Sequence, residues 1–280
     1  MSQPAGPPTH GCSDSASMRP LREFPEAARG RIRGVFCDID DTLTWKDRLP
    51  AVAYAALERL YDSGLIVVPI TGRPAGWCDA IARHWPVSAV VGENGAFYFR
   101  YDRERRCMVR RYWRTEEQRR VDRQELEQIA HRVLRAVPGA RIAADQPYRE
   151  ADLAIDFRED VSLPMSEADR IRDIFEERGA TAKISSIHVN GWFGDYDKLS
   201  MTRALMRESF GTDLEALREE FVFAGDSPND APLFGFFPNA VGVANIRQFA
   251  DRLRVMPRWV TEREGGFGFA ELVEFLLEGR

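Results

Sequence analysis

Short apolar runs of strand-forming residues alternate with helical stretches along most of the 280-residue chain. Strands that alternate with helices are typical of a parallel sheet whose strands are joined by crossover helices. The sequence therefore predicts an α/β fold. Before residue 97 the pattern gives strands at 34–39, 65–70 and 88–91 and helices at 51–62 and 75–84.

This alternation is interrupted between residues 97 and 190. The pattern there predicts an antiparallel pair, a long amphipathic helix, and then a strand, a helix and a strand-like run, at 96–101, 107–113, 116–136, 153–157, 167–178 and 182–189. Such a series has the content of a separate α+β domain. The alternation returns with helices at 199–210, 231–236 and 269–277 and strands at 221–224 and 240–243. We expect a Rossmann-like core of residues 28–96 and 191–280, with an α+β domain inserted at 97–190.

Composition narrows the class of protein further. No apolar run approaches the ~18 residues of a membrane span, and the net charge of −5 argues against a protein that coats nucleic acid. Residues 1–27 begin with a stretch rich in Pro, Gly and Ser and lack the apolar run of a signal peptide, so a flexible tail is expected. The four cysteines, Cys12, Cys37, Cys78 and Cys107, form no CxxC pair, which is typical of reduced thiols in the cytoplasm. Cys37 and Cys78 are expected to be buried.

Three acidic residues, Asp38, Asp40 and Asp41, follow directly after the first predicted strand. In open parallel sheets ligands bind beyond the carboxyl ends of the strands, where Asp38 and Asp40 are expected to project. Carboxylates this close repel one another, and a cation with oxygen ligands, commonly Mg²⁺ beside phosphates, relieves the repulsion. By itself the pattern is also typical of a solvated acidic turn or a helix N-cap.

Two further predicted strands end in polar turns. The strand at 65–70 leads into Thr71, Gly72 and Arg73, where a hydroxyl and open backbone N–H groups can meet an anion. The strand at 221–224 leads into Gly-Asp-Ser-Pro-Asn-Asp at 225–230, whose Asp226 and Asp230 can meet a metal ion. Each turn alone is typical of structure rather than function. Together, the three strand ends place a nucleophilic carboxylate, an anion-binding hydroxyl and metal-ligating carboxylates at one edge of the sheet.

Four segments, in this order, resemble the motifs of the haloacid dehalogenase superfamily: residues 38–42, Thr71-Gly72, Lys198 and residues 225–230. The Gly-Glu-Asn-Gly-Ala turn at 92–96, followed by an insert of about ninety residues before Lys198, is similar to the Cof-type subgroup, subclass IIB. That subgroup includes sucrose-phosphate, mannosyl-phosphoglycerate and trehalose-phosphate phosphatases. Two positions depart from the common pattern: Asp41 stands where Gly is frequent, and Pro228 lies inside the last acidic loop.

The resemblance implies a metal-dependent mechanism that passes through a phosphoaspartate. It makes Asp38 the nucleophile and Asp40 the general acid and base. Thr71 and Lys198 are implied to hold the phosphoryl oxygens, and Lys198 also to neutralise Asp38. The implied ligands of Mg²⁺ are Asp38, the backbone carbonyl of Asp40, Asp226, Asn229 and Asp230.

The resemblance also implies that the inserted domain is a cap that closes over the site and selects the substrate. The substrate-binding residues that we expect are Thr71, Gly72, Arg73, Asn94, His188 and Asn190, with a hinge role left open for the last two. Between residues 100 and 123, ten arginines stand against five acidic residues. This excess indicates either a solvated surface or recognition of a second anionic group, with nucleic acid as a weaker third interpretation.

Lysine is rare in this chain, since only Lys46, Lys183 and Lys198 occur among the 39 Lys and Arg residues. Lys198 falls on a motif position where a compact ammonium fits between a phosphoryl group and Asp38. No role is assigned to the other two.

The function expected from all this is that of a cytoplasmic Mg²⁺-dependent phosphatase acting on a sugar phosphate or a similar small phosphomonoester. A phosphomannomutase-like phosphotransferase and a catalytically silent sugar-phosphate-binding module stay open as alternatives, because both share the core. The expected partner is a small phosphorylated metabolite. The sequence names neither the sugar nor the oligomeric state.

Overall fold

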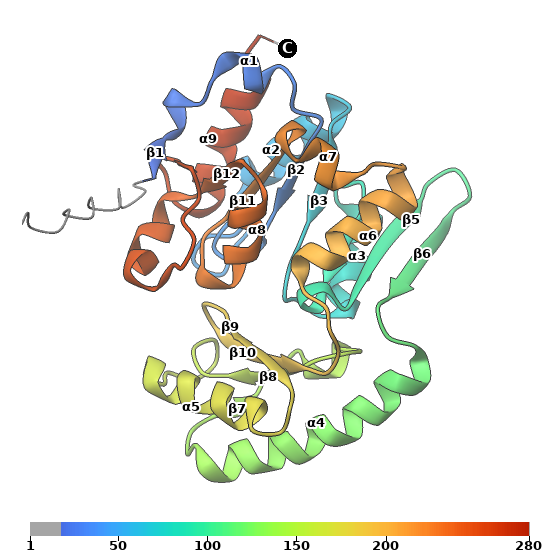
Figure 1. Ribbon diagram of the computed structural model, residues 1–280, viewed down its shortest axis with the longest axis vertical. Helices are drawn as coiled ribbons and strands as arrows, with labels where there is room; N and C mark the ends of the chain where they lie inside the picture. Colours follow the sequence, from blue (N-terminus) through green and yellow to red (C-terminus); the bar gives the residue numbers. More distant parts are fainter. Residues whose placement is uncertain (1–17, 280) are drawn as a thin grey trace, which may run out of the picture.

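The computed structural model describes residues 18–279, and its centre is a six-stranded parallel sheet (Figure 1). Its strand order is β1-β13-β12-β11-β2-β3. The three neighbouring strands β12, β11 and β2 consist entirely of buried residues, as expected for parallel strands covered on both faces. The predicted α/β class is therefore confirmed. The strands are β1 (Arg19–Pro20), β2 (Gly34–Cys37), β3 (Ile66–Pro69), β11 (Phe221–Gly225), β12 (Asn239–Gly242) and β13 (Trp259–Val260).

Helices cover both faces of this sheet. Val35 and Phe36 are neighbours in β2 and belong to different core clusters, because successive side chains of a strand point to opposite faces. The Val35 cluster includes Leu57 and Leu272, and the Phe36 cluster includes Leu205. The first face is covered by α2 (Ala51–Asp62), α3 (Ala75–His84) and α9 (Gly265–Leu277), and the second by α6 (Lys198–Phe210) and α8 (Ala231–Phe236). The remaining short helices are α1 (Glu26–Arg29) and α7 (Leu214–Leu217).

The start of the described chain belongs to the core. Arg19 pairs with Trp259 across β1 and β13, and Leu21 and Phe24 are buried in the first core cluster. The prediction of a tail up to residue 27 is therefore wrong for residues 18–27, because two large apolar side chains anchor this stretch. Residues 1–17 of the predicted tail, with Cys12, lie outside the described residues.

The antiparallel pair that we assigned to the inserted domain packs on the core instead. It consists of β5 (Phe97–Asp102) and β6 (Cys107–Tyr112), and β5 also pairs with β4 (Val90–Gly92). A bridge between Ile70 and Val91 continues this sheet from the edge of the core sheet. Phe97 and Phe99 stack in the first core cluster. The predicted domain boundary at residue 97 therefore moves to the end of the hairpin, because its apolar face is buried against the core.

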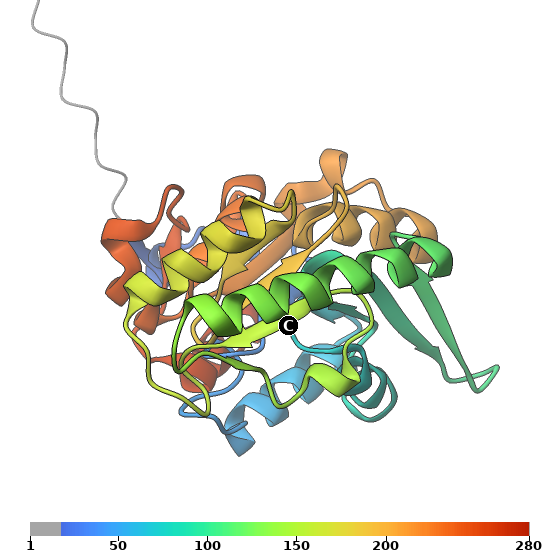
Figure 2. The same ribbon diagram turned by 90° about the horizontal axis from the view of Figure 1, so that it is seen from below.

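The cap that remains is a four-stranded antiparallel sheet with two helices on one face (Figures 1 and 2). The strand order is β7-β8-β10-β9, and the run at 182–189 that we predicted as one strand forms parts of two. Val189 faces the helices and is buried with them, so its neighbours His188 and Asn190 face the core. The cap elements are α4 (Glu116–Ala136), β7 (Arg141–Ile142), β8 (Leu153–Asp156), α5 (Met165–Glu176), β9 (Thr181–Ile184) and β10 (His188–Trp192).

Three of the core strands end on the side that faces the cap. The expected site residues Asp38 and Asp226 directly follow β2 and β11, and Thr71 lies two residues after the end of β3. Cys37 and Cys78 are buried free thiols, as expected. Within residues 18–279, no helix has the length and apolar character needed to cross a membrane.

Candidate active site

Three buried carboxylates and one buried lysine meet at the carboxyl ends of β2 and β11. Asp38, Asp226 and Asp230 each place one carboxylate oxygen within 4.8 Å of the others. The pairing of β2 with β11 brings this about, since the backbone N–H of Asp38 donates to the carbonyl of Ala224, 2.9 Å away. The motifs at 38–42 and 225–230 are thus joined by direct strand pairing.

Lys198 lies between two of these carboxylates. Its Nζ is 2.8 Å from Oδ1 of Asp38 and 2.8 Å from Oδ1 of Asp230. Lys198 is the first residue of α6, and Asp197 caps this helix by accepting the backbone N–H of Ser200. Burial by itself lowers the pKa of Lys198, but Asp230 and Asp38 raise it above its ordinary value. The lysine is therefore held in its charged form.

Gly95 of the Gly-Glu-Asn-Gly-Ala turn sets the position of α6. It has φ of +106°, and a Cβ built on it would lie 2.1 Å from the carbonyl oxygen of Asp197. No residue with a side chain fits there without moving the start of the helix. The close approach of this turn is what brings Lys198 to Asp38.

Gly225 has a comparable role in the acidic loop. A Cβ at this position would lie 2.5 Å from Oδ2 of Asp230, which accepts the backbone N–H of Asp226 at 3.2 Å. The loop is thereby folded so that both carboxylates turn toward Asp38. Asn229, a predicted metal ligand, lies beside the cluster and its Oδ1 accepts a hydrogen bond from Ser227.

The carboxylate cluster fits a hard divalent cation. Three carboxylates face one lysine, so the cluster holds more negative than positive charge in a buried place. Burial raises the pKa of Asp38 to about 8 against the pull of Lys198, and burial together with Asp38 and Asp230 raises the pKa of Asp226. A cation removes this repulsion, and an all-oxygen donor set of this kind suits Mg²⁺.

Thr71, Gly72 and Asn94 lie together, and Gly72 lines the same cavity as Asp38. Thr71 is fully buried, its Oγ1 accepts the backbone N–H of Arg73, and its carbonyl accepts the backbone N–H of Asn94. Asn94 has φ of +55°, and its Nδ2 is buried without a hydrogen-bond partner among the described residues. That amide lies against Gly72, where a Cβ would come within 3.2 Å. A buried amide donor left unpaired against the Thr71–Gly72 turn is suited to an oxyanion.

Asp40 lines the same cavity as Asp38, and its carboxylate is bound by Arg73. The guanidinium of Arg73 contacts both carboxylate oxygens of Asp40, at 2.8 to 3.0 Å, and also Oε1 of Glu159 at 3.1 Å. Glu159 belongs to the cap, and its other oxygen lies 2.9 Å from Nε2 of His188. His188 and Arg73 hold the pKa of Glu159 at about 2 although it is partly buried. Arg73 therefore connects the expected general acid to the cap.

A second connection between core and cap was missed in the sequence. The buried carboxylate of Glu93 accepts the backbone N–H groups of Ala75 in the core and of Glu150, Ala151 and Asp152 in the cap, at 2.6 to 3.1 Å. Burial and then Asp152 raise the pKa of Glu93, whereas these N–H donors lower it. A glutamate in a turn after a buried strand was the only local signal.

Arg149 was also missed, and it extends the same contact. Its fully buried guanidinium binds Asp145 and Asp152 and donates to the carbonyl of Gly72 at 2.8 Å. Asp152 in turn accepts a hydrogen bond from Asn190 at 2.9 Å. The predicted substrate residues His188 and Asn190 therefore line the site, and each already has a contact within the cap.

The space enclosed by these groups is small. The catalytic cavity, whose lining includes Asp38, Arg73, Arg149, His188 and Asn190, measures about 20 Å³. That is room for about one water molecule, so the cap is closed. None of the ten arginines between residues 100 and 123 lines this cavity. Several of them bind acidic side chains of the core, as Arg110 binds Asp79 and Arg111 binds Glu208, which disfavours a role for this stretch in substrate recognition.

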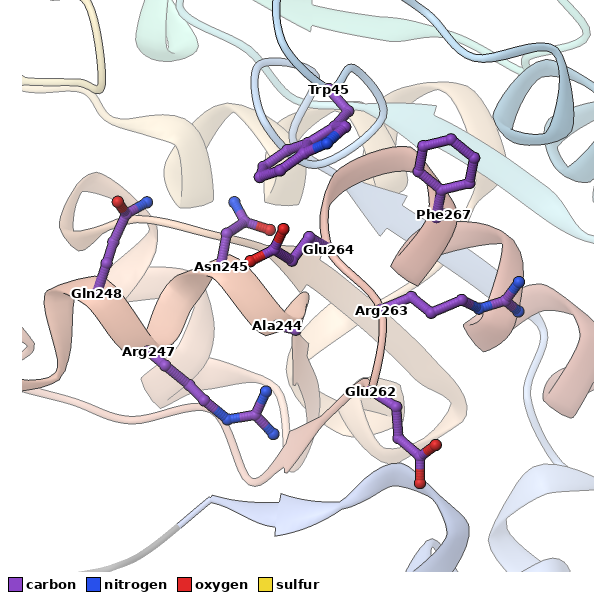
Figure 3. Close-up of a pocket in the computed structure, with 9 residues that line it drawn as sticks. All are labelled: Trp45, Ala244, Asn245, Arg247, Gln248, Glu262, Arg263, Glu264 and Phe267. Carbon is purple, nitrogen blue, oxygen red and sulfur yellow. The ribbon is translucent and has the colours of Figure 1, made fainter.

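A hollow of about 620 Å³ has Trp45, Asn245 and Phe267 among the residues that line it (Figure 3). Its floor includes Asn245, whose Nδ2 donates to the carbonyl of Asp41 at 2.9 Å and lies 3.4 Å from Oδ2 of Asp226. Asn245 was not predicted, and it ties the two acidic loops together. Asp41 has φ of +54°, a left-handed conformation that glycine adopts without strain.

Comparisons with known proteins agree with this geometry. Residues 35–124 match the model of a family described as haloacid dehalogenase-like hydrolase. The resemblance inferred from the motifs is confirmed. No curated protein matches the chain. Because the solved structures below are less than 25% identical to it, they show the shared haloacid dehalogenase-like fold.

Three solved structures illustrate that fold. A protein from Thermoplasma acidophilum has a TM-score of 0.66 and 21% identity, with 88% of this chain and 98% of that chain covered. The sucrose-phosphatase of Synechocystis sp. PCC6803, solved with sucrose and phosphate, has a TM-score of 0.61 and 13% identity, with 88% of this chain and 98% of that chain covered. A sugar phosphatase of subclass IIB of the haloacid dehalogenase superfamily has a TM-score of 0.56 and 15% identity, with 82% of this chain and 93% of that chain covered.

Proposed function

We propose that this protein is a Mg²⁺-dependent phosphatase that hydrolyses a sugar phosphate or a similar small phosphomonoester through a phosphoaspartate at Asp38. The observation that carries the proposal is the contact of Lys198 with both Asp38 and Asp230, inside a cluster completed by Asp226. The family match supports hydrolase chemistry. The sucrose-phosphatase and the subclass IIB sugar phosphatase with the same fold support a phosphorylated sugar as substrate.

The chemistry assigned to the chain's own residues is a double displacement. One carboxylate oxygen of Asp38 forms a bond to phosphorus while the bond from phosphorus to the leaving oxygen breaks, and Asp40 in its acid form gives its proton to that oxygen. Asp40, now a carboxylate, takes a proton from a water whose oxygen attacks the phosphoaspartate. Orthophosphate leaves, and both aspartates return to their starting forms.

The other residues stabilise the charge that develops on the phosphoryl group. We assign Lys198, Thr71 and the amide of Asn94 to its oxygens, which the contact of Lys198 with Asp38 and the unpaired Nδ2 of Asn94 support. Asp38, Asp226, Asp230 and the backbone carbonyl of Asp40 are the groups that would hold Mg²⁺, with Asn229 beside them. Bound there, the ion supplies positive charge to the phosphoryl oxygens and to the crowded carboxylates.

The test is phosphate release by Asp38→Asn. We expect the wild type to hydrolyse p-nitrophenyl phosphate and hexose phosphates with Mg²⁺, without any bisphosphate activator, and to lose activity when EDTA is present. Asp38→Asn should reduce turnover by at least about a thousandfold, since asparagine supplies no anionic nucleophile. Asp41→Asn is the matched control, because asparagine tolerates the positive φ at that position and the Asp41 carboxylate is outside the cluster. Substantial turnover by Asp38→Asn would rule out the covalent mechanism.

A further inference from the structure

The largest hollow that adjoins the catalytic cavity lies between cap and core. This hollow, here called the side cleft, measures about 870 Å³, and Arg172, Lys183 and Ser185 of the cap face Asn229, Arg252 and Arg254 of the core across it. It shares Ser185, Ser227 and Asn229 with the catalytic cavity. The catalytic cavity itself has no room for a leaving group. For any part of a substrate beyond its phosphoryl group, the side cleft is therefore a larger adjoining space than the hollow of about 290 Å³ that shares Arg149 with the cavity.

Lys183 is directed into the side cleft by the register of the cap sheet. It lies opposite Asn190 in the pairing of β9 with β10, and paired residues share one face of a sheet. Ala182, its neighbour in β9, points the other way into the apolar core of the cap. Figure 1 shows β9 on the side of the cap that faces the core. The lysine is thus paired directly with a residue that lines the catalytic cavity.

The side cleft has more positive than negative charge. Four cationic and two acidic side chains line it, and Asp169 is already engaged by Arg172 at 3.0 Å and by Arg252 at 3.9 Å. Glu176 interacts with Arg172. The side chains of Lys183 and Arg254 have no hydrogen-bond or ion-pair partner among residues 18–279. Two unpaired cations in a cleft next to the catalytic carboxylates are suited to an anion.

We propose that the side cleft holds the leaving group of the substrate and that Lys183 binds a second anionic group on it, a carboxylate or a further phosphate. This inference rests on the proposed phosphatase function and narrows it to phosphomonoesters of acidic leaving groups. Lys183 is a specificity residue in this scheme. The bond that breaks and the groups that break it are unchanged.

The experiment compares substrates that differ only in that anionic group. The first pair is 6-phosphogluconate and glucitol 6-phosphate, and the second is 3-phosphoglycerate and glycerol 3-phosphate. In each pair a carboxylate replaces a hydroxymethyl group on the same carbon chain. We expect the wild type to prefer the acid in kcat/KM by about tenfold in at least one pair, which is the usual size of a hydrogen bond to a charged group.

Variants then assign the preference to Lys183. Lys183→Gln should remove it by raising KM for the acid, and Lys183→Arg should restore part of it. Arg135→Gln is the control, because it also removes one positive charge from an exposed position of the cap, on α4 and outside the cleft. A wild type without preference in either pair would overturn the proposal, as would an equal loss for acid and alcohol in Lys183→Gln.

Failure of the cleft proposal is distinguishable from failure of the phosphatase proposal. Suppose that the protein hydrolyses p-nitrophenyl phosphate, glucitol 6-phosphate and glycerol 3-phosphate but does not prefer the two substrates that carry a carboxylate. This result contradicts the cleft proposal alone. If no phosphate ester is hydrolysed, the phosphatase proposal fails. Calorimetric titration of the protein with the same four esters then tests the cleft proposal. Binding of the acid that is about tenfold weaker in Lys183→Gln supports it, and equal binding of acid and alcohol overturns it.

Discussion

Lys198 stabilises the fold in addition to the chemistry proposed for it, because its charge compensates carboxylates that have been removed from water. Breaking a buried ion pair by removing one partner leaves an unpaired charge and costs about 3–5 kcal/mol. We therefore expect Lys198→Met to lose phosphatase activity and to lower the free energy of unfolding by roughly this amount when no divalent cation is present. Added Mg²⁺ should restore part of the stability, since an ion that binds the folded state stabilises it.

Urea unfolding of Lys198→Met with EDTA and with Mg²⁺ measures this effect. Lys46→Met is the matched control, because Lys46 is exposed and outside the cluster, so its replacement should stay within about 0.5 kcal/mol. Equal stability of the two variants in EDTA would show that the carboxylates near Lys198 are neutral in the folded protein.

At the scale of elements, α6 carries Lys198, and its start is fixed by the turn at Glu93–Gly95. Gly95→Ala forces a Cβ into the backbone of Asp197, so the start of the helix has to shift. We expect loss of at least about 1–3 kcal/mol of stability, the usual cost of overpacking, and a large fall in kcat because Lys198 moves from Asp38.

Gly211, at the other end of the same helix, provides the control. It also has a positive φ, of +60°, but nothing lies within 4 Å of a Cβ built there. Gly211→Ala should cost about 1 kcal/mol for the left-handed conformation and leave kcat unchanged. Thermal unfolding and steady-state kinetics of both variants test the difference. If the two glycine variants had the same kcat, the turn would not position Lys198.

At the scale of the whole molecule, Glu159 joins the cap to the core through Arg73. A carboxyl group whose pKa is lower in the folded state than in the unfolded state stabilises the fold at pH values above its unfolded pKa. This stabilisation is lost as the pH falls toward the folded pKa. The folded pKa of Glu159 is about 2, against an ordinary value of 4.5. Wild type should therefore be more stable than Glu159→Gln at pH 5 to 7, and the difference should shrink from pH 4.5 toward 2.

Calorimetric melting curves between pH 3 and 7 measure this difference. We expect the melting temperature of wild type to exceed that of Glu159→Gln by a few degrees at pH 7, because about 1 kcal/mol shifts the melting temperature of a chain of this size by roughly 2–4 °C. Glu167→Gln on α5 is the control, since Glu167 belongs to the cap and makes its ion pair with Arg170 of the same helix. A difference in melting temperature that does not change with pH would mean that the charge of Glu159 does not bind the cap to the core.

The sequence by itself determined most of the strands and helices and the charged and polar residues that lie at the strand ends. These depend on local patterns: apolar runs bury strands, helical spacing forms one apolar face, and carboxylates after a strand must project from its end. Asp38, Asp226 and Asp230 therefore meet as expected, because parallel pairing of β2 and β11 leaves them no other edge.

Only the tertiary structure decided which segments pack together across long stretches of chain. The hairpin of β5 and β6 packs on the core, and the stretch at 18–27 is anchored there, since partner surfaces far away in sequence bury Phe97 and Leu21. Glu93 meets backbone groups 57 to 59 residues away, and Arg73 meets Glu159 across 86 residues. Such contacts leave no local pattern, because the burial that gives them strength exists only after the cap has closed on the core.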